Sequence, residues 1–175
     1  MNYKSIKLIY KLKKAKTKQL IKEIKSYINS SPNGLDLFWF LMYLDPDFIF
    51  KIISTLEKDE NWIGIEKVLE VLPYVRNNKI FTEIVIQYLQ HPNPDLQIAS
   101  LRFFRITGRS EYLQLFDFLL HTNNKLVVKE LIETVGYTSP PNAIILLKKI
   151  EEKWGNLIPP EYYIRAKIEI GVSQG

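Results

Sequence analysis

Two histidines are the residues of this chain whose type best suits proton transfer or metal binding. His91 and His121 lie 30 residues apart, each in a polar segment that follows an apolar one. A catalytic histidine needs a partner that orients it and a reacting group within reach. Equivalent residues of stacked repeats lie about 10 Å apart, the spacing of packed helices, which is too far for one shared metal ion. We therefore interpret both histidines as turn residues at one position of a repeat.

Other reactive patterns are absent from the sequence. The chain has no cysteine, which excludes disulfides, zinc–thiolate sites and thiol catalysis. It has no glycine-rich phosphate loop, no nucleophile elbow and no paired histidine–carboxylate spacing. The segment with Glu57, Asp59 and Glu60 lacks the alternation and the glycine of a calcium loop, so we interpret it as a solvated charged turn. The sequence predicts a protein that is not an enzyme and uses no cofactor, metal or small-molecule substrate.

Positive charge is concentrated at the start of the chain. Residues 1–25 contain nine lysines and one glutamate, a balance of +8, whereas the other 150 residues contain 15 basic and 18 acidic residues, a balance of −3. The net charge of +5 therefore describes a basic head on a slightly acidic body. Because a nucleic-acid-binding groove needs basic residues over a wide surface, this distribution disfavours nucleic acid as the partner.

The hydropathy pattern predicts a cytoplasmic protein. The longest apolar run, residues 37–44, has eight residues, well short of the roughly 20 that cross a bilayer. Lysines interrupt every apolar run near the N-terminus, which is unlike a signal peptide.

Apolar residues recur at helical spacing along the whole chain and predict about eleven helices joined by short loops, with no strand pair. Asp45 and Pro46 mark one helix start, and Pro73 ends or kinks another helix. Ser110 is expected to cap the helix after it, and Gly136 to close the next one. Two helices are expected within residues 1–30, and the others at about 35–44, 46–56, 62–72, 78–89, 94–107, 110–120, 125–136, 141–154 and 160–170.

The stretch from His91 to Gly136 overlays on itself when it is shifted by 30 residues. The shift places Leu89 on Leu119, His91 on His121, Asn93 on Asn123, Leu96 on Leu126 and Leu101 on Leu131. A period between 20 and 50 residues with helical patterns in each unit indicates a repeat array.

Residues 92–108 resemble HEAT repeats of the short bacterial, phycobilisome-lyase-like type. The matching positions are Pro94, Leu96, Ser100, Phe104 and Gly108. The resemblance implies an all-α fold, an α-solenoid in which about five antiparallel helix hairpins form a right-handed superhelix of the HEAT/armadillo kind. Many such repeats carry an arginine where this chain has Gln97 and Val127, which implies stacking held mainly by apolar contacts. We expect one HEAT-like domain over residues 1–175, with basic capping helices at 1–30, the repeat stack at 35–154 and a C-terminal capping helix at 159–175.

Two groups of residues are candidates for binding a partner protein. The first group lies within about a 60° arc of one helix and consists of Arg102, Arg105 and Arg109. These arginines either bind an acidic segment of a partner or form a solvated face of the helix. The aromatic helix with Phe38, Trp39, Phe40 and Tyr43 is either core or, through Trp39 and Tyr43, a docking surface.

A third candidate is the lysine face of the first helix. Lys4, Lys7, Lys11 and Lys14 fall within about an 80° arc. This face is either the polar cap of a repeat stack or a contact to an anionic membrane surface through residues 1–16. The function expected overall is that of a non-enzymatic protein–protein interaction scaffold built from HEAT-like repeats. A nucleic-acid-binding HEAT-like protein and a membrane-peripheral adaptor that uses the basic first helix are the alternatives.

Overall fold

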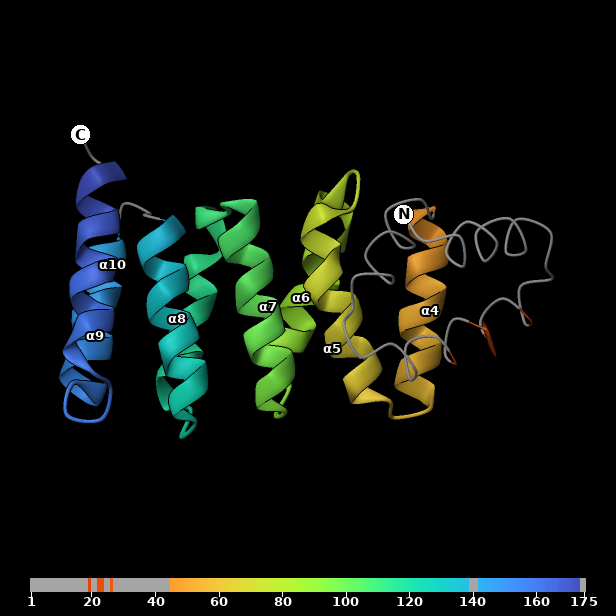
Figure 1. The fold of residues 1–175 in the computed structure, drawn as a ribbon, viewed down its shortest axis with the longest axis horizontal. Coiled ribbons are helices and arrows are strands. Elements are labelled where there is room, and N and C mark those ends of the chain that lie inside the picture. The colour runs from red at the N-terminus through yellow and green to blue at the C-terminus, as the bar shows by residue number, and fades with distance from the viewer. Residues whose placement is uncertain (1–18, 20–21, 24–25, 27–44, 139–141, 174–175) are drawn as a thin grey trace. The chain divides into compact units, whose positions relative to one another are not determined.

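The computed structural model describes residues 19, 22–23, 26, 45–138 and 142–173 (Figure 1). Within these residues every regular element is a helix and none is a strand, so the all-α expectation is confirmed for them. The chain divides into two compact units, Met1–Glu83 and Ile84–Gly175. The lysine face of residues 1–16 and the aromatic helix with Trp39 and Tyr43 lie outside the described residues.

Two packed helices, α4 (Pro46–Lys58) and α5 (Trp62–Val71), are the first labelled elements of the first unit. Asp45 caps α4, because its side chain accepts a hydrogen bond from the backbone N–H of Asp47 at 2.9 Å. Pro46 occupies the first turn, as expected, where the missing N–H costs nothing. The side of α4 that is buried carries Ile49, Ile52, Ile53 and Leu56.

Pro73 ends α5, as the sequence predicts. The chain passes from Val71 into the 3₁₀ helix η1 (Leu72–Tyr74), because a proline ring cannot continue the α-helical hydrogen bonds. The 3₁₀ helix η2 (Asn78–Phe81) then leads into α6 (Thr82–Leu89). The rings of Phe50 and Phe81 lie 5.0 Å apart, so η2 packs against α4 within this unit.

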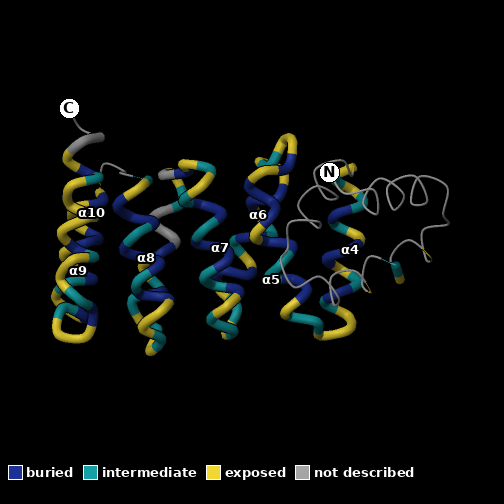
Figure 2. The backbone as a smooth tube through the Cα atoms, viewed as in Figure 1, coloured by how far each residue is buried: buried dark blue, intermediate teal, exposed yellow. Residues whose placement is uncertain are grey.

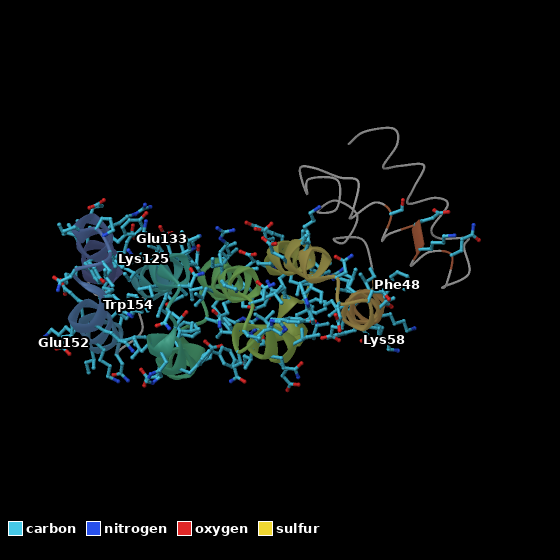
Figure 3. All side chains as sticks on the ribbon, turned by 90° about the horizontal axis from the view of Figure 1, so that it is seen from below. Phe48, Lys58, Lys125, Glu133, Glu152 and Trp154 are labelled. Atoms are coloured by element: carbon cyan, nitrogen blue, oxygen red, sulfur yellow. The ribbon has the colours of Figure 1, made fainter. Side chains whose placement is uncertain are left out.

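The second unit consists of two rows of helices. In chain order its elements after α6 are α7 (Pro94–Thr107), η3 (Ser110–His121), α8 (Lys125–Thr138), α9 (Ala143–Trp154) and α10 (Pro160–Ser173). The first row consists of α7, α8 and α10, because α8 packs against both of the others. The second row consists of η3 and α9, which pack against each other (Figure 3). The helices carry buried residues along one side and exposed residues along the other (Figure 2).

The three helices of the first row run in the same direction. On α7, Arg102 and Arg105 pair with Glu130 and Glu133 of α8 in ascending order. On the other side of α8, Lys129 lies over the ring of Tyr162 and Gly136 lies against Ala166, again in ascending order. The elements between them, η3 and α9, must therefore return the chain to the start of the next helix.

Equivalent residues of α7 and α8 are buried alike. Leu96, Ser100 and Phe104 have their counterparts in Val127, Leu131 and Val135, each 31 positions later, and all six side chains are buried. The buried residues of the two helices are thus 31 positions apart, whereas the loop residues before them, such as His91 and His121, are 30 positions apart.

The segment Ser110–His121 is a 3₁₀ helix and not the capped α-helix that the sequence analysis expects. Arg109 precedes it, and no side chain caps it, so the prediction that Ser110 is the cap is wrong. Runs of 3₁₀ helix beyond four residues are uncommon. This one has a sequence that repeats in threes, one polar and two apolar residues, which matches three residues per turn: Glu111-Tyr112-Leu113, Gln114-Leu115-Phe116 and Asp117-Phe118-Leu119.

Gly136 does not close its helix. The helix α8 continues to Thr138, and Gly136 is buried inside it. A β-carbon at this position would lie 2.8 Å from the Cα of Ala166 on α10. The glycine is therefore explained by the close approach of two helices and not by the end of one.

Candidate functional site

Arg102 and Arg105, two of the three arginines expected to bind a partner, form ion pairs with α8. The Nε of Arg102 lies 3.1 Å from Oε2 of Glu130, and Nη2 of Arg105 lies 3.0 Å from Oε1 of the same carboxylate. Arg105 also pairs with Glu133. These ion pairs join α7 to α8, in addition to the mainly apolar stacking that the sequence predicts.

The carboxylate of Glu130 is the buried centre of this network. Glu130 is 8% exposed, and burial raises its pKa above the ordinary value of 4.5. The positive charges of Arg105 and Arg102 act in the opposite direction, because they favour the ionised carboxylate. Removal of either arginine would therefore leave a partly uncompensated charge between the two helices.

Arg109 does not share a surface with the other two arginines. Arg109 is only 8% exposed, and its guanidinium carbon lies 5.7 Å from the centre of the Phe103 ring. This geometry is that of a cation–π contact within the molecule. The structure thus brings Arg102 and Arg105 together and places Arg109 elsewhere.

A groove of about 320 Å³ lies on the first row of the second unit, between α8 and α10. Its lining residues are Arg105, Glu133, Gly136, Tyr137, Glu161, Tyr162, Arg165, Ala166 and Glu169. Figure 3 shows Glu133 on the side of α8 that faces away from η3 and α9, so the groove opens on the outer surface of the row. Gly136 and Ala166 allow the helices to approach closely at the groove, because neither has a side chain beyond a β-carbon.

The groove combines tyrosine rings with charges of both signs. Tyr137 is 63% exposed, and the Nζ of Lys129 lies 5.0 Å from the centre of the Tyr162 ring. The lining has three carboxylates and two guanidinium groups, of which Arg105 is paired with α8. Arg165 is exposed, and no described residue forms an ion pair with it.

Among the groove residues, only Arg105 is a binding candidate in the sequence, and Gly136 is expected there only to close a helix. A signal for the others exists, because Glu161, Arg165 and Glu169 recur every four residues and so share one face of a helix. The neighbouring helix cannot be identified in this way, since α8 and α10 are separated by the whole of α9.

Of the two histidines, His91 lies in the bend before α7 and His121 is the last residue of η3. The backbone N–H of Asn93 donates a hydrogen bond to Nδ1 of His91 at 3.1 Å, and Asn93 in turn caps α7 by accepting one from the N–H of Asp95 at 2.9 Å. His121 is exposed at the end of η3. Over the described ranges, no group of three or more residues with metal-binding side chains comes together. None of the described helices is long and apolar enough to cross a membrane.

Comparisons of the chain with protein-family models, with curated proteins and with solved structures gave no match. The function proposed below is therefore inferred from the packing of the helices and from the groove between α8 and α10.

Proposed function

We propose that this chain is a non-enzymatic, HEAT-like helical repeat protein that binds another protein in the groove between α8 and α10. The observation that carries the proposal is the groove itself, where exposed Tyr137 and Arg165 stand beside a closely packed pair of helices. Tyrosine and arginine, together with tryptophan, are enriched among the residues that dominate protein–protein binding energy.

The helix arrangement of the second unit supports the repeat part of the proposal. In α-solenoids, equivalent helices stack in parallel in one row, and the helices between them stack in another. The contacts of α7, α8 and α10 agree with a row of parallel helices. Ion pairs join α8 to α7 on one side, and the Gly136–Ala166 contact joins α8 to α10 on the other. Repeat proteins bind their partners on extended concave surfaces of such stacks.

The size and chemistry of the groove support the binding part. A volume of about 320 Å³ lies at the small end of the range for ligand pockets, and it suits one or two side chains of a partner. The rim is polar and the ring of Tyr137 is exposed, as in interfaces that form between separately folded proteins.

Photo-crosslinking tests this proposal. A photoreactive phenylalanine analogue is introduced at Tyr137 in the full chain, which is expressed in its native host, and the crosslinked products are identified by mass spectrometry. The matched control places the same analogue at Leu126, which is 61% exposed and lies on the same helix but does not line the groove. We expect one defined protein adduct at position 137 and a much lower yield at position 126.

Substitution then tests whether the adduct depends on the groove. Arg165→Ala removes a side chain that lines it, and we expect at least a fivefold loss of the adduct, since truncation of an interface anchor costs more than about 1 kcal/mol. Equal yields at positions 137 and 126, or no protein adduct at either, would contradict the proposal.

A further inference from the structure

The charged side chains at the groove are balanced in sign, and all but two of them interact within this chain. The basic groups are Arg105, Lys129 and Arg165, and the acidic groups are Glu133, Glu161 and Glu169. Arg105 pairs with Glu133, and Lys129 lies over the ring of Tyr162. Glu169 also has an interaction within the chain. Glu161 and Arg165 are exposed, and no described residue forms an ion pair with either. A partner that satisfies both must present one cation and one anion.

Glu161 and Arg165 belong to an exposed stripe along α10. Together with Ile164 and Ile168 they follow the spacing i, i+3, i+4 and i+7, which places all four on one face of the helix. Ile164 is 57% exposed and Ile168 is 59% exposed. The buried side chains of α10 lie on the opposite face. The helix therefore has a second apolar stripe outside the core, bordered by one charge of each sign, and such a surface is typical of a contact with another molecule.

We propose that the partner at the groove is a second copy of this chain, which packs its own α10 antiparallel against this stripe about a two-fold axis. The inference rests on the proposed protein-binding function and identifies the partner. In a two-fold contact one surface faces itself, so each residue pair across the contact occurs twice. A surface with one glutamate and one arginine is complemented in charge by its own copy. A uniformly acidic or basic segment would satisfy only one of the two charges.

The spacing of the two charges defines the register of this contact. Glu161 and Arg165 lie about 3 Å along the helix on either side of the level of Tyr163. A two-fold axis at that level therefore places Glu161 of each copy opposite Arg165 of the other. Arg165 then anchors the second copy through its carboxylate.

The same register brings the exposed apolar residues together. Ile164 lies beside the axis, so it contacts Ile164 of the second copy. Ile168 reaches the start of the second copy's α10, next to Leu157, which is 49% exposed. Arg165 lines the groove and Ile164 does not, so the ion pairs lie on the groove side of the contact and the isoleucines on the other side.

Tyr137 also faces the second copy in this arrangement. Because Gly136 is level with Ala166, Tyr137 lies about 6 Å beyond the axis, at the level where the second copy's α10 begins. One helix from each copy makes a small interface, which is typical of a weak and reversible dimer. We expect the purified full-length chain to dimerise with a dissociation constant in the micromolar range, measured by sedimentation equilibrium.

Charge reversal tests the two-fold pairing. Glu161→Arg places two arginines opposite each other and Arg165→Glu places two glutamates opposite each other, so we expect each variant alone to dimerise about tenfold more weakly or worse. A mixture of the two variants restores both pairs, since one chain supplies two arginines and the other two glutamates. We expect this mixture to form a heterodimer about as stable as the parent dimer. The rescue also shows that both variants are folded.

An aspartate at the centre of the contact tests its apolar part. Ile164→Asp brings two carboxylates together beside the axis, and we expect it to abolish the dimer. The matched control is Ile145→Asp, because Ile145 is also 57% exposed. It lies on α9 one turn before Lys149, which pairs with Asp117 of η3, so it faces away from α10. This control should dimerise like the parent chain.

The outcomes separate this inference from the proposed function. With the photoreactive analogue at Tyr137, the expected adduct joins that position to residues 157–161 of a second copy. An adduct with a different protein would overturn the inference and leave protein binding standing. A dimer that survives both single charge reversals, or a mixture that fails to restore it, would also show that the inference is wrong. If the chain sediments as a monomer and position 137 gives no protein adduct, both proposals are wrong.

Discussion

Gly136 on α8 faces Ala166 on α10 so closely that a β-carbon on Gly136 would lie 2.9 Å from the β-carbon of Ala166 and 2.8 Å from its Cα. The contact positions two rows of side chains, those of α8 and those of α10, on the two sides of one groove. The packing of the last helix of the first row and the geometry of the candidate site therefore depend on the same pair of residues.

Gly136→Ala should destabilise the protein, because the new methyl group meets the backbone of Ala166, which cannot move without displacing α10. We expect a loss of about 1–3 kcal/mol in the free energy of unfolding, the usual cost of overpacking, measured by urea denaturation. The matched control is Gly171→Ala on α10, where a β-carbon meets nothing within 4 Å, and where alanine should add up to about 1 kcal/mol. Equal effects of the two substitutions would contradict the close approach.

Arg105→Ala should also destabilise the protein, since it removes the contacts of this arginine with Glu130 and Glu133 and leaves the buried carboxylate of Glu130 less compensated. A loss of about 2 kcal/mol is expected for contacts to a charged group that is buried. Lys149→Ala is the control, because the pair of Lys149 with Asp117 is exposed on both sides and such pairs contribute at most about 1 kcal/mol. Equal losses in the two variants would mean that burial of Glu130 is not decisive.

The raised pKa of Glu130 predicts a stability that depends on acid pH. Since burial raises the pKa of the folded state above the unfolded value of 4.5, the folded protein binds the proton more tightly. The contribution of Glu130 to stability is therefore most favourable below pH 4.5 and declines as the pH rises through the folded-state pKa. We expect the stability of the parent chain relative to Glu130→Gln to fall over this window when unfolding is measured at successive pH values. A rise over the same window would show that the two arginines outweigh burial and that the folded-state pKa is lowered.

Tyr163→Phe should be neutral or stabilising by about 1 kcal/mol at neutral pH, because the hydroxyl of Tyr163 is buried and has no hydrogen-bond partner among the described residues. Burial, with a smaller effect of Glu151, raises the pKa of Tyr163 to about 12 from 10. The unfolded chain therefore loses this proton first, and the stability of the parent chain should fall as the pH rises from 10 to 12. The phenylalanine variant should lose less stability over that range in thermal unfolding measurements. A clear loss at neutral pH would instead show that the hydroxyl makes a stabilising contact.

The sequence predicts most helices of the described residues, because the signals that start and end them are local. Asp45 with Pro46, Asn93 with Pro94, and Pro73 act through hydrogen bonds and sterics within a few residues, so they can be read without knowing the fold. The 3₁₀ character of Ser110–His121 also has a local signal, its repeat of three residues, which a search for α-helical spacing misses.

The sequence by itself predicted the all-α class, which is confirmed for the described residues, and the helix limits that depend on Asp45, Pro46, Pro73, Asn93 and Pro94. Each of these follows from residues that are neighbours along the chain. Tertiary structure alone decided the roles of Arg105 and Gly136, because each depends on a residue of another helix: Glu130, 25 positions from Arg105, and Ala166, 30 positions from Gly136. An arginine on an exposed stripe and a glycine near a helix end have the same local pattern whether they face solvent or a neighbouring helix. Only the packing of α7, α8 and α10 distinguishes these cases, and the same packing forms the groove.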